Sequence, residues 1–163
     1  MVPVALNRSI IDNSPLDPPE PPHVTPSYYA GILVNSLIGN SGSAKVTELP
    51  VPDENVSGYA VYEGNTLKRA VFVNLHAWLL SSTGVRPSVH IDLLFSRDSG
   101  FGGTKATAKR LLLNHADDLD NLTFAGQSFE TRDARPTGKI VEEEIDLAEG
   151  LDIQSTEAIL ISL

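Results

Sequence analysis

The chain has 163 residues, the length of one ordinary domain, and its 41% hydrophobic and 20% charged residues exclude a disordered composition. Twelve Lys and Arg against 21 Asp and Glu give a formal net charge of −9, so we expect no nucleic acid as a partner. The absence of cysteine excludes disulfides, thiol catalysis and thiolate metal sites, and no apolar run is long enough to predict a membrane span.

The N-terminal part predicts a loop and then one helix. Met1 to Leu6 lack the basic start and the apolar run of a signal peptide. Residues 14–26 contain six prolines, which predict an extended loop. Thr25 and Pro26 then predict a helix start, and Gly39 its end, so we expect a helix over 26–38. Because this helix is apolar on most sides, we expect it to need burial on two sides, by more surface than this chain offers. Deletion of residues 1–39 is therefore expected to improve solubility.

After residue 43 the apolar residues recur with the period of two that is typical of strands. This spacing predicts strands over 46–49, 56–63, 67–75, 88–95, 105–113, 122–129, 139–147 and 158–163, with a hairpin turn at Gly64-Asn65. Short strands separated by turns predict a mainly β fold, an antiparallel β-sandwich of about seven or eight strands. The chain thus divides into residues 1–39, a loop plus a helix, and residues 44–163, the β-sandwich.

The polar clusters offer few candidates for catalysis. His90 and Asp92 share a strand face, and a neighbouring strand with Asn74 and His76 would suggest a metal site, but a solvent-facing sheet surface explains them as well. The acidic stretch 117–120 lacks the spacing of a calcium loop and is typical of turns. The run Glu142 to Glu144 is typical of a solvated strand. We therefore predict no catalytic residue, no metal site and no cofactor in this chain.

Three residues are candidate sugar contacts: Trp78, Phe124 and Gln127. Aromatic side chains at strand spacing are more often part of a core, and Trp78, just after a predicted strand, has the best prospect of exposure. Three sequons at Asn7, Asn55 and Asn121 are candidate N-glycosylation sites if the chain is secreted.

Several stretches, taken in order, are similar to one family. They include Leu6-Asn7-Arg8-Ser9, Pro22-His23-Val24-Thr25-Pro26, Val56-Ser57-Gly58-Tyr59-Ala60, Arg69-Ala70-Val71-Phe72-Val73, Phe124-Ala125-Gly126-Gln127-Ser128-Phe129-Glu130 and Ser155-Thr156-Glu157-Ala158. Together they resemble the C-terminal part of fungal β-glucuronidases of glycoside hydrolase family 79, the heparanase-related enzymes. The resemblance covers nearly the whole chain, with Phe124 where the family favours Trp.

The resemblance implies a division of labour. In such enzymes a (β/α)₈ barrel carries catalysis and a β-sandwich follows it, so residues 1–39 would be the last barrel loop and helix. Both catalytic glutamates lie in the barrel, so no residue here inherits their role and no hydrolysis is expected from this chain alone. The implied partner is the barrel, the implied location of the parent enzyme is extracellular, and the loop near 124–130 would approach its substrate cleft. A freestanding carbohydrate-binding module is the alternative, and an autonomous hydrolase using Glu142 and Glu144 a further one.

Overall fold

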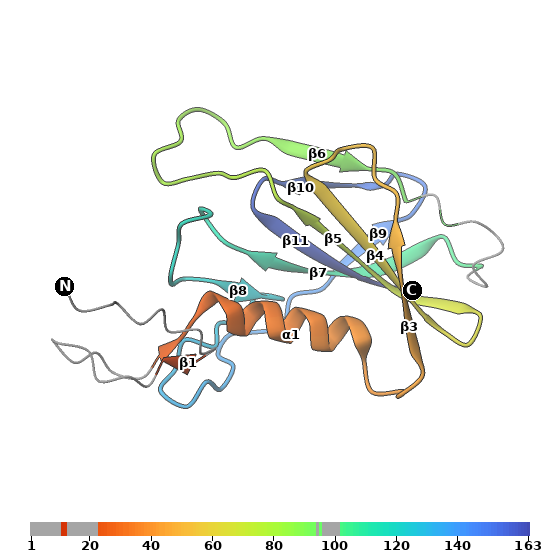
Figure 1. The fold of residues 1–163 in the computed structure, drawn as a ribbon, viewed down its shortest axis with the longest axis horizontal. Coiled ribbons are helices and arrows are strands. Elements are labelled where there is room, and N and C mark those ends of the chain that lie inside the picture. Colours follow the sequence, from red (N-terminus) through yellow and green to blue (C-terminus); the bar gives the residue numbers. More distant parts are fainter. Residues whose placement is uncertain (1–10, 13–22, 94, 96–101) are drawn as a thin grey trace, which may run out of the picture.

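The structure is a computed structural model, and it describes residues 11–12, 23–93, 95 and 102–163 (Figure 1). Its elements in chain order are β1 (Ile11–Asp12), β2 (His23–Val24), α1 (Pro26–Ile38), β3 (Ala44–Leu49), β4 (Val56–Glu63), β5 (Thr66–Asn74), β6 (Ser88–Ile91), β7 (Lys105–Leu112), β8 (Thr123–Phe124), β9 (Glu143–Asp146), β10 (Leu151–Gln154) and β11 (Glu157–Ser162). The predicted mainly β, antiparallel fold is confirmed.

A seven-stranded antiparallel sheet forms the middle layer of the domain. Its strand order is β3-β4-β5-β11-β7-β8, with β9 also paired to β7. The strands β6 and β10 form a separate two-stranded ribbon. Figure 1 shows the ribbon on one side of the large sheet and α1 along the other side. Each face of the sheet is therefore covered by a different partner.

Two apolar cores result from this layering. The first lies between the sheet and the β6–β10 ribbon and includes Phe72, Ile153 and Ile159. The second lies between the opposite face of the sheet and α1, and includes Leu33, Val71 and Leu160. Residues on β5 and β11 alternate between the two cores, because successive side chains of a strand point to opposite faces.

The predicted helix is confirmed, with the predicted bounds 26–38. Thr25 has extended backbone at the N-cap position, and Pro26 begins the helix where its missing N–H costs nothing. Gly39 ends the helix with a positive φ of 68°, which favours glycine, and its N–H donates to the Asn35 carbonyl over 2.9 Å.

The sheet of this chain buries one side of α1. Tyr29, Leu33 and Leu37, spaced four residues apart, are buried in the second core. This chain therefore covers one of the two sides on which burial was expected, and Leu33 there is only 6% exposed. The opposite side of α1 stays open, with Val34 50% exposed.

The predicted strand over 122–129 is wrong beyond Phe124. The chain reverses after β8 in a tight turn at Ala125 and Gly126, whose φ angles are 50° and 73°. Phe124 and Gln127 close this turn with two backbone hydrogen bonds of 2.9 and 3.0 Å. Positive φ at both central residues is typical of a type I′ turn, and Ala at the first position gave no sign of it in the sequence.

The other differences concern short strands. The predicted strand over 139–147 is reduced to β9, and β10 was not predicted as a strand. Of the predicted strand over 88–95, only Ser88–Ile91 pairs as β6, and residue 94 lies outside the described residues.

Candidate functional site

The open side of α1 is the first part of the candidate site. Its exposed residues are Ser27, Ala30, Gly31, Val34, Asn35 and Ile38. The whole helix contains no charged residue. A helix that faces solvent normally carries charged side chains on its outer side, so an uncharged outer side is typical of a helix that is covered by another structure. We call these six residues the outer face of α1.

Arg69 on β5 holds the C-terminal end of the helix in place. Its Nε donates to the Leu37 carbonyl over 2.6 Å and its Nη2 to the Ile38 carbonyl over 3.1 Å. These carbonyls are the negative end of the helix dipole, which a guanidinium neutralises. Arg69 also pairs with Glu63, and this hydrogen bond and charge hold the pKa of the Glu63 carboxyl below its usual 4.5.

Tyr29 holds the N-terminal half of the helix. Its hydroxyl accepts the Phe129 N–H over 2.9 Å and lies 3.3 Å from Glu130 Oε1. Burial raises the pKa of this phenol. Glu130 in turn accepts the backbone N–H groups of Asn121 and Leu122 over 2.9 and 2.8 Å. Residues 124–130, which the sequence comparison singled out, therefore pack against α1 and hydrogen-bond to it through Tyr29.

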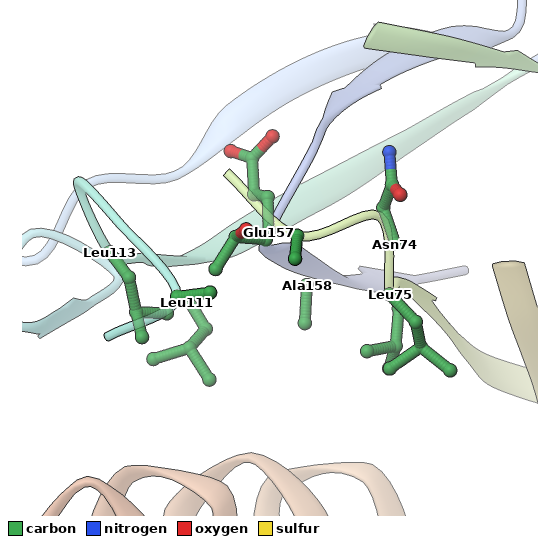
Figure 2. Close-up of a pocket in the computed structure, with 10 residues that line it drawn as sticks. Asn74, Leu75, Leu111, Leu113, Glu157 and Ala158 are labelled. Carbon is green, nitrogen blue, oxygen red and sulfur yellow. The ribbon is translucent and has the colours of Figure 1, made fainter. Parts of the chain in front are cut away.

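An apolar depression next to α1 is the second part of the candidate site. Its volume is about 260 Å³, and its walls are Val73, Asn74, Leu75, Ala77, Leu111, Leu113, Ala116, Thr156, Glu157 and Ala158. Figure 2 shows Leu75, Leu111, Leu113 and Ala158 pointing towards the α1 side of the sheet, while Asn74 and Glu157 point away from it. Leu75 is 61% exposed, so the depression is an uncovered part of the sheet face that α1 covers elsewhere. We call it the sheet depression.

The polar groups behind the sheet depression are occupied by contacts within the chain. The buried Glu157 carboxylate lies 3.2 Å from Arg110 Nη1 and accepts the Gln154 N–H over 2.8 Å. Burial alone would lower the pKa of Arg110, but Glu157 and Glu143 beside it raise the pKa overall. Asn74 donates to the Ile153 carbonyl over 3.0 Å. These groups fix β10 and β11 and leave the surface of the depression apolar.

The three candidate sugar contacts lie in different surroundings. Trp78 is half-buried on the β5–β6 connection, where its backbone N–H donates to Thr156 Oγ1 over 2.8 Å. Phe124 is 6% exposed within the second core, which leaves it little surface to offer a ligand. Gln127 is half-buried after the tight turn, and its amide donates to the Gly138 carbonyl over 3.3 Å. Sugar contact stays a prediction for all three residues, and Phe124 offers the least surface for it.

The structure does not bring His90 and His76 together. Strand β6 pairs with β10 and not with β5, so His90 Nδ1 lies 2.9 Å from Asp152 Oδ1. His76 lies instead 3.0 Å from Asp53. Among the described residues, no three His, Asp or Glu side chains are placed to hold a metal ion.

The remaining acidic side chains have local partners. Glu142, Glu143 and Glu144 pair with Lys109, Arg110 and Lys105 on or beside β7. In the stretch after His115, Asp117 accepts the Leu80 N–H and Asp118 the His115 N–H, over 2.9 and 2.7 Å. The carboxylates in both places serve strand pairing and turns.

Two of the three sequons lie on described surface. Asn55 is exposed in the turn before β4. Asn121 is exposed too, with φ 61°, and its amide donates to Asp120 over 2.6 Å. Asn7 lies outside the described residues. No helix in the described part of the chain combines the length and hydropathy needed to cross a membrane.

Comparison with known proteins relates this architecture to one family. The family model described as the glycosyl hydrolase family 79 C-terminal beta domain matches residues 58–160. A β-glucuronidase from Aspergillus niger is 24% identical over 153 residues, which are 83% of this chain and 28% of that protein. A solved 4-O-α-L-rhamnosyl-β-D-glucuronidase from Fusarium oxysporum, in a Rha-GlcA complex, shares the fold with a TM-score of 0.67 at 22% identity, over 83% of this chain and 29% of that chain. This chain therefore spans less than a third of either protein.

Proposed function

Because the chain belongs to the glycosyl hydrolase family 79 C-terminal β-domain family, we propose that it is the non-catalytic C-terminal domain of a β-glucuronidase-like enzyme. Its role would be to support the catalytic (β/α)₈ barrel by docking through the outer face of α1. In this assembly α1 is the last barrel helix, with the sheet on one side and the barrel on the other.

The uncharged outer face of α1 is the observation that carries this proposal. The sheet already buries Tyr29, Leu33 and Leu37, so the fold of this domain does not require apolar residues on the other side. Val34 and Ile38 are nevertheless 50% and 42% exposed there. The length of the relatives supports a large partner, because about 70% of each lies outside the part that this chain matches.

Catalysis would belong to the barrel. The acid/base and the nucleophile of a retaining glycosidase are two carboxylates about 5–5.5 Å apart, one with a raised pKa. Glu142, Glu143 and Glu144 are instead solvent-accessible side chains that form ion pairs with basic residues of β7, so they do not supply such a partly buried carboxyl pair. We therefore expect the purified chain to release no product from a chromogenic β-glucuronide between about pH 3 and 7, and turnover would contradict this.

Cysteine labelling tests the docking, because the natural chain has no cysteine of its own. The chain is grafted onto the Aspergillus niger β-glucuronidase in place of the segment that it matches, and Val34→Cys is introduced. Maleimide labelling at residue 34 is then followed by peptide mass spectrometry in this chimera and in the isolated chain. Val46→Cys is the matched control, because Val46 is 54% exposed on the edge strand β3.

We expect Val34→Cys to react at least about tenfold more slowly in the chimera, while Val46→Cys reacts equally in both. Equal labelling of Val34→Cys in both proteins would overturn the proposed docking.

Direct contact with carbohydrate is a second role, supported by the partial exposure of Trp78. If this role is real, titration of the isolated chain with a β-glucuronide will detect binding, and Trp78→Ala will abolish it without lowering the melting temperature. A lowered melting temperature would instead assign Trp78 to packing.

A further inference from the structure

We propose that the sheet depression is a socket that receives a large apolar side chain from the catalytic domain docked on α1. This inference rests on the proposed function, because the same partner supplies the inserted side chain. It adds a second contact region that does not involve the helix itself.

The socket exists because α1 covers only part of its sheet face. Leu111 and Ala158 lie in the second core, and Val73 and Leu113 pack partly against it. Leu75 continues the same alternation on the β5 side, but it is 61% exposed. None of the walls comes from α1, so an apolar stretch of this face is left uncovered within the described part of the chain.

The rim of the socket is preformed by hydrogen bonds. The Ala116 N–H donates to the Trp78 carbonyl over 2.6 Å and so joins the β7–β8 connection to the β5–β6 connection. The Thr156 hydroxyl accepts the Trp78 N–H and donates to the His76 carbonyl over 3.1 Å. A preformed cavity costs little conformational entropy when a side chain enters it.

The size and chemistry of the socket suit an apolar group. Its volume of about 260 Å³ is many times the roughly 10–15 Å³ that one water molecule needs on the same measure. Leucine, valine and alanine side chains make up most of its walls, and the side chains of Asn74 and Glu157 point to the other side of the sheet (Figure 2). A polar or charged occupant would therefore lose its hydrogen bonds to water without replacing them.

The catalytic domain is the occupant that the chain direction favours. The matched family is a C-terminal domain that corresponds to residues 58–160, so the rest of a relative precedes it in the chain, and here the chain reaches this part through α1. Figure 1 shows α1 beginning beside β8, and α1 contacts β8. The end of β7, which leads to β8, supplies the wall residue Leu111, and the wall residue Leu113 follows directly after this strand. A domain that enters here and lies against α1 meets the uncovered sheet face next to it.

Leu75→Cys in the same chimera tests the socket. Leu75 is exposed on the rim, so its substitution leaves the fold intact, and we expect at least about tenfold slower labelling in the chimera than in the isolated chain. If Val34→Cys is protected and Leu75→Cys is not, the socket is refuted while the docking stands. If neither is protected, the proposed function fails together with the socket.

A second variant measures whether the socket contributes to docking. Leu75→Asp places a charge on the rim and should leave the melting temperature of the isolated chain within about 2 °C of wild type, since most surface substitutions cost little. In the chimera, Leu75→Asp should increase the labelling rate of Val34→Cys at least about fivefold, because weaker docking exposes residue 34 more often. Unchanged labelling would show that the socket is empty in the docked state. Thr47→Asp, an exposed change on β3 that adds the same single negative charge, is the matched control.

Discussion

Replacement of Leu33 by Ala tests the packing of α1 on the sheet. Leu33 is 6% exposed in the second core, and the adjacent Val34 is 50% exposed on the outer face. The two positions have the same helical backbone and differ in what surrounds them. Leu33→Ala should destabilise the isolated chain strongly, and Val34→Ala should leave its stability nearly unchanged.

The magnitude follows from the loss of buried methyl groups and the cavity that remains. A fully buried Leu→Ala change costs about 2.7–5 kcal/mol, and the small residual exposure of Leu33 places it near about 3 kcal/mol. In a chain of this size, 1 kcal/mol lowers the melting temperature by about 2–4 °C. We therefore expect a loss of about 6–12 °C for Leu33→Ala, measured by circular dichroism at pH 7. Val34→Ala should change the melting temperature by less than about 2 °C, because Ala favours the helix slightly.

Similar small changes for both variants would refute the packing. They would mean that α1 does not lie on the sheet when the chain is alone. This outcome would agree with the expectation from sequence that the helix needs more surface than this chain offers. In that case deletion of residues 1–39 would improve solubility. If Leu33→Ala behaves as calculated, the same deletion should lower the folded yield, because it exposes the second core.

Four further predictions concern charges and modification. Arg69→Met should cost about 1–2 kcal/mol in urea unfolding, since two helix carbonyls lose their donor; an unchanged midpoint would contradict this. The pKa of Glu63 is lowered in the folded state, so its stabilisation is present above about pH 4.5 and is lost as the pH falls through the lowered pKa. The melting temperature should therefore fall more steeply below about pH 4.5 in wild type than in Arg69→Met. Arg110→Met should cost roughly 3–5 kcal/mol because it leaves Glu157 buried without its ion pair, and adding Glu157→Gln should restore part of the loss; a double variant as unstable as the single one would refute this role. If the chain is secreted from yeast behind a signal peptide, Asn55→Gln should remove one glycan from the intact mass, and an unchanged mass would exclude that site.

Local signals explain the parts of the fold that the sequence predicted well. Thr25-Pro26 and Gly39 act on their own backbone, so the helix bounds needed no tertiary information. The hairpin at Gly64-Asn65 and the period-two strands on each side of it are local in the same sense, and β4 has the predicted bounds. The apolar character of residues 26–38 on most sides is equally local, and it predicts a helix that is covered on two sides.

Strand pairing and layer order lay beyond local signals. A strand with His76 was one possible neighbour of His90, but β6 pairs with a strand more than 50 residues later in the chain, and no pattern near His90 indicates that choice. The same applies to Glu157, whose burial depends on Arg110 from β7. The sheet depression had no sequence signal at all, because Leu75 continues the apolar alternation of β5, and its 61% exposure depends on which elements cover that face.

The sequence by itself determined the mainly β class, the helix from 26 to 38 and its uncharged outer side, because hydrophobic period and capping residues act over a few neighbours. Only the tertiary structure decided that one side of α1 rests on the sheet of this chain while the other stays open. That decision depends on contacts between residues far apart in sequence, such as Tyr29 with Phe129 and Leu37 with Arg69. Such contacts form only when the whole sheet is assembled, and they leave the outer face and the sheet depression together on one side of the domain.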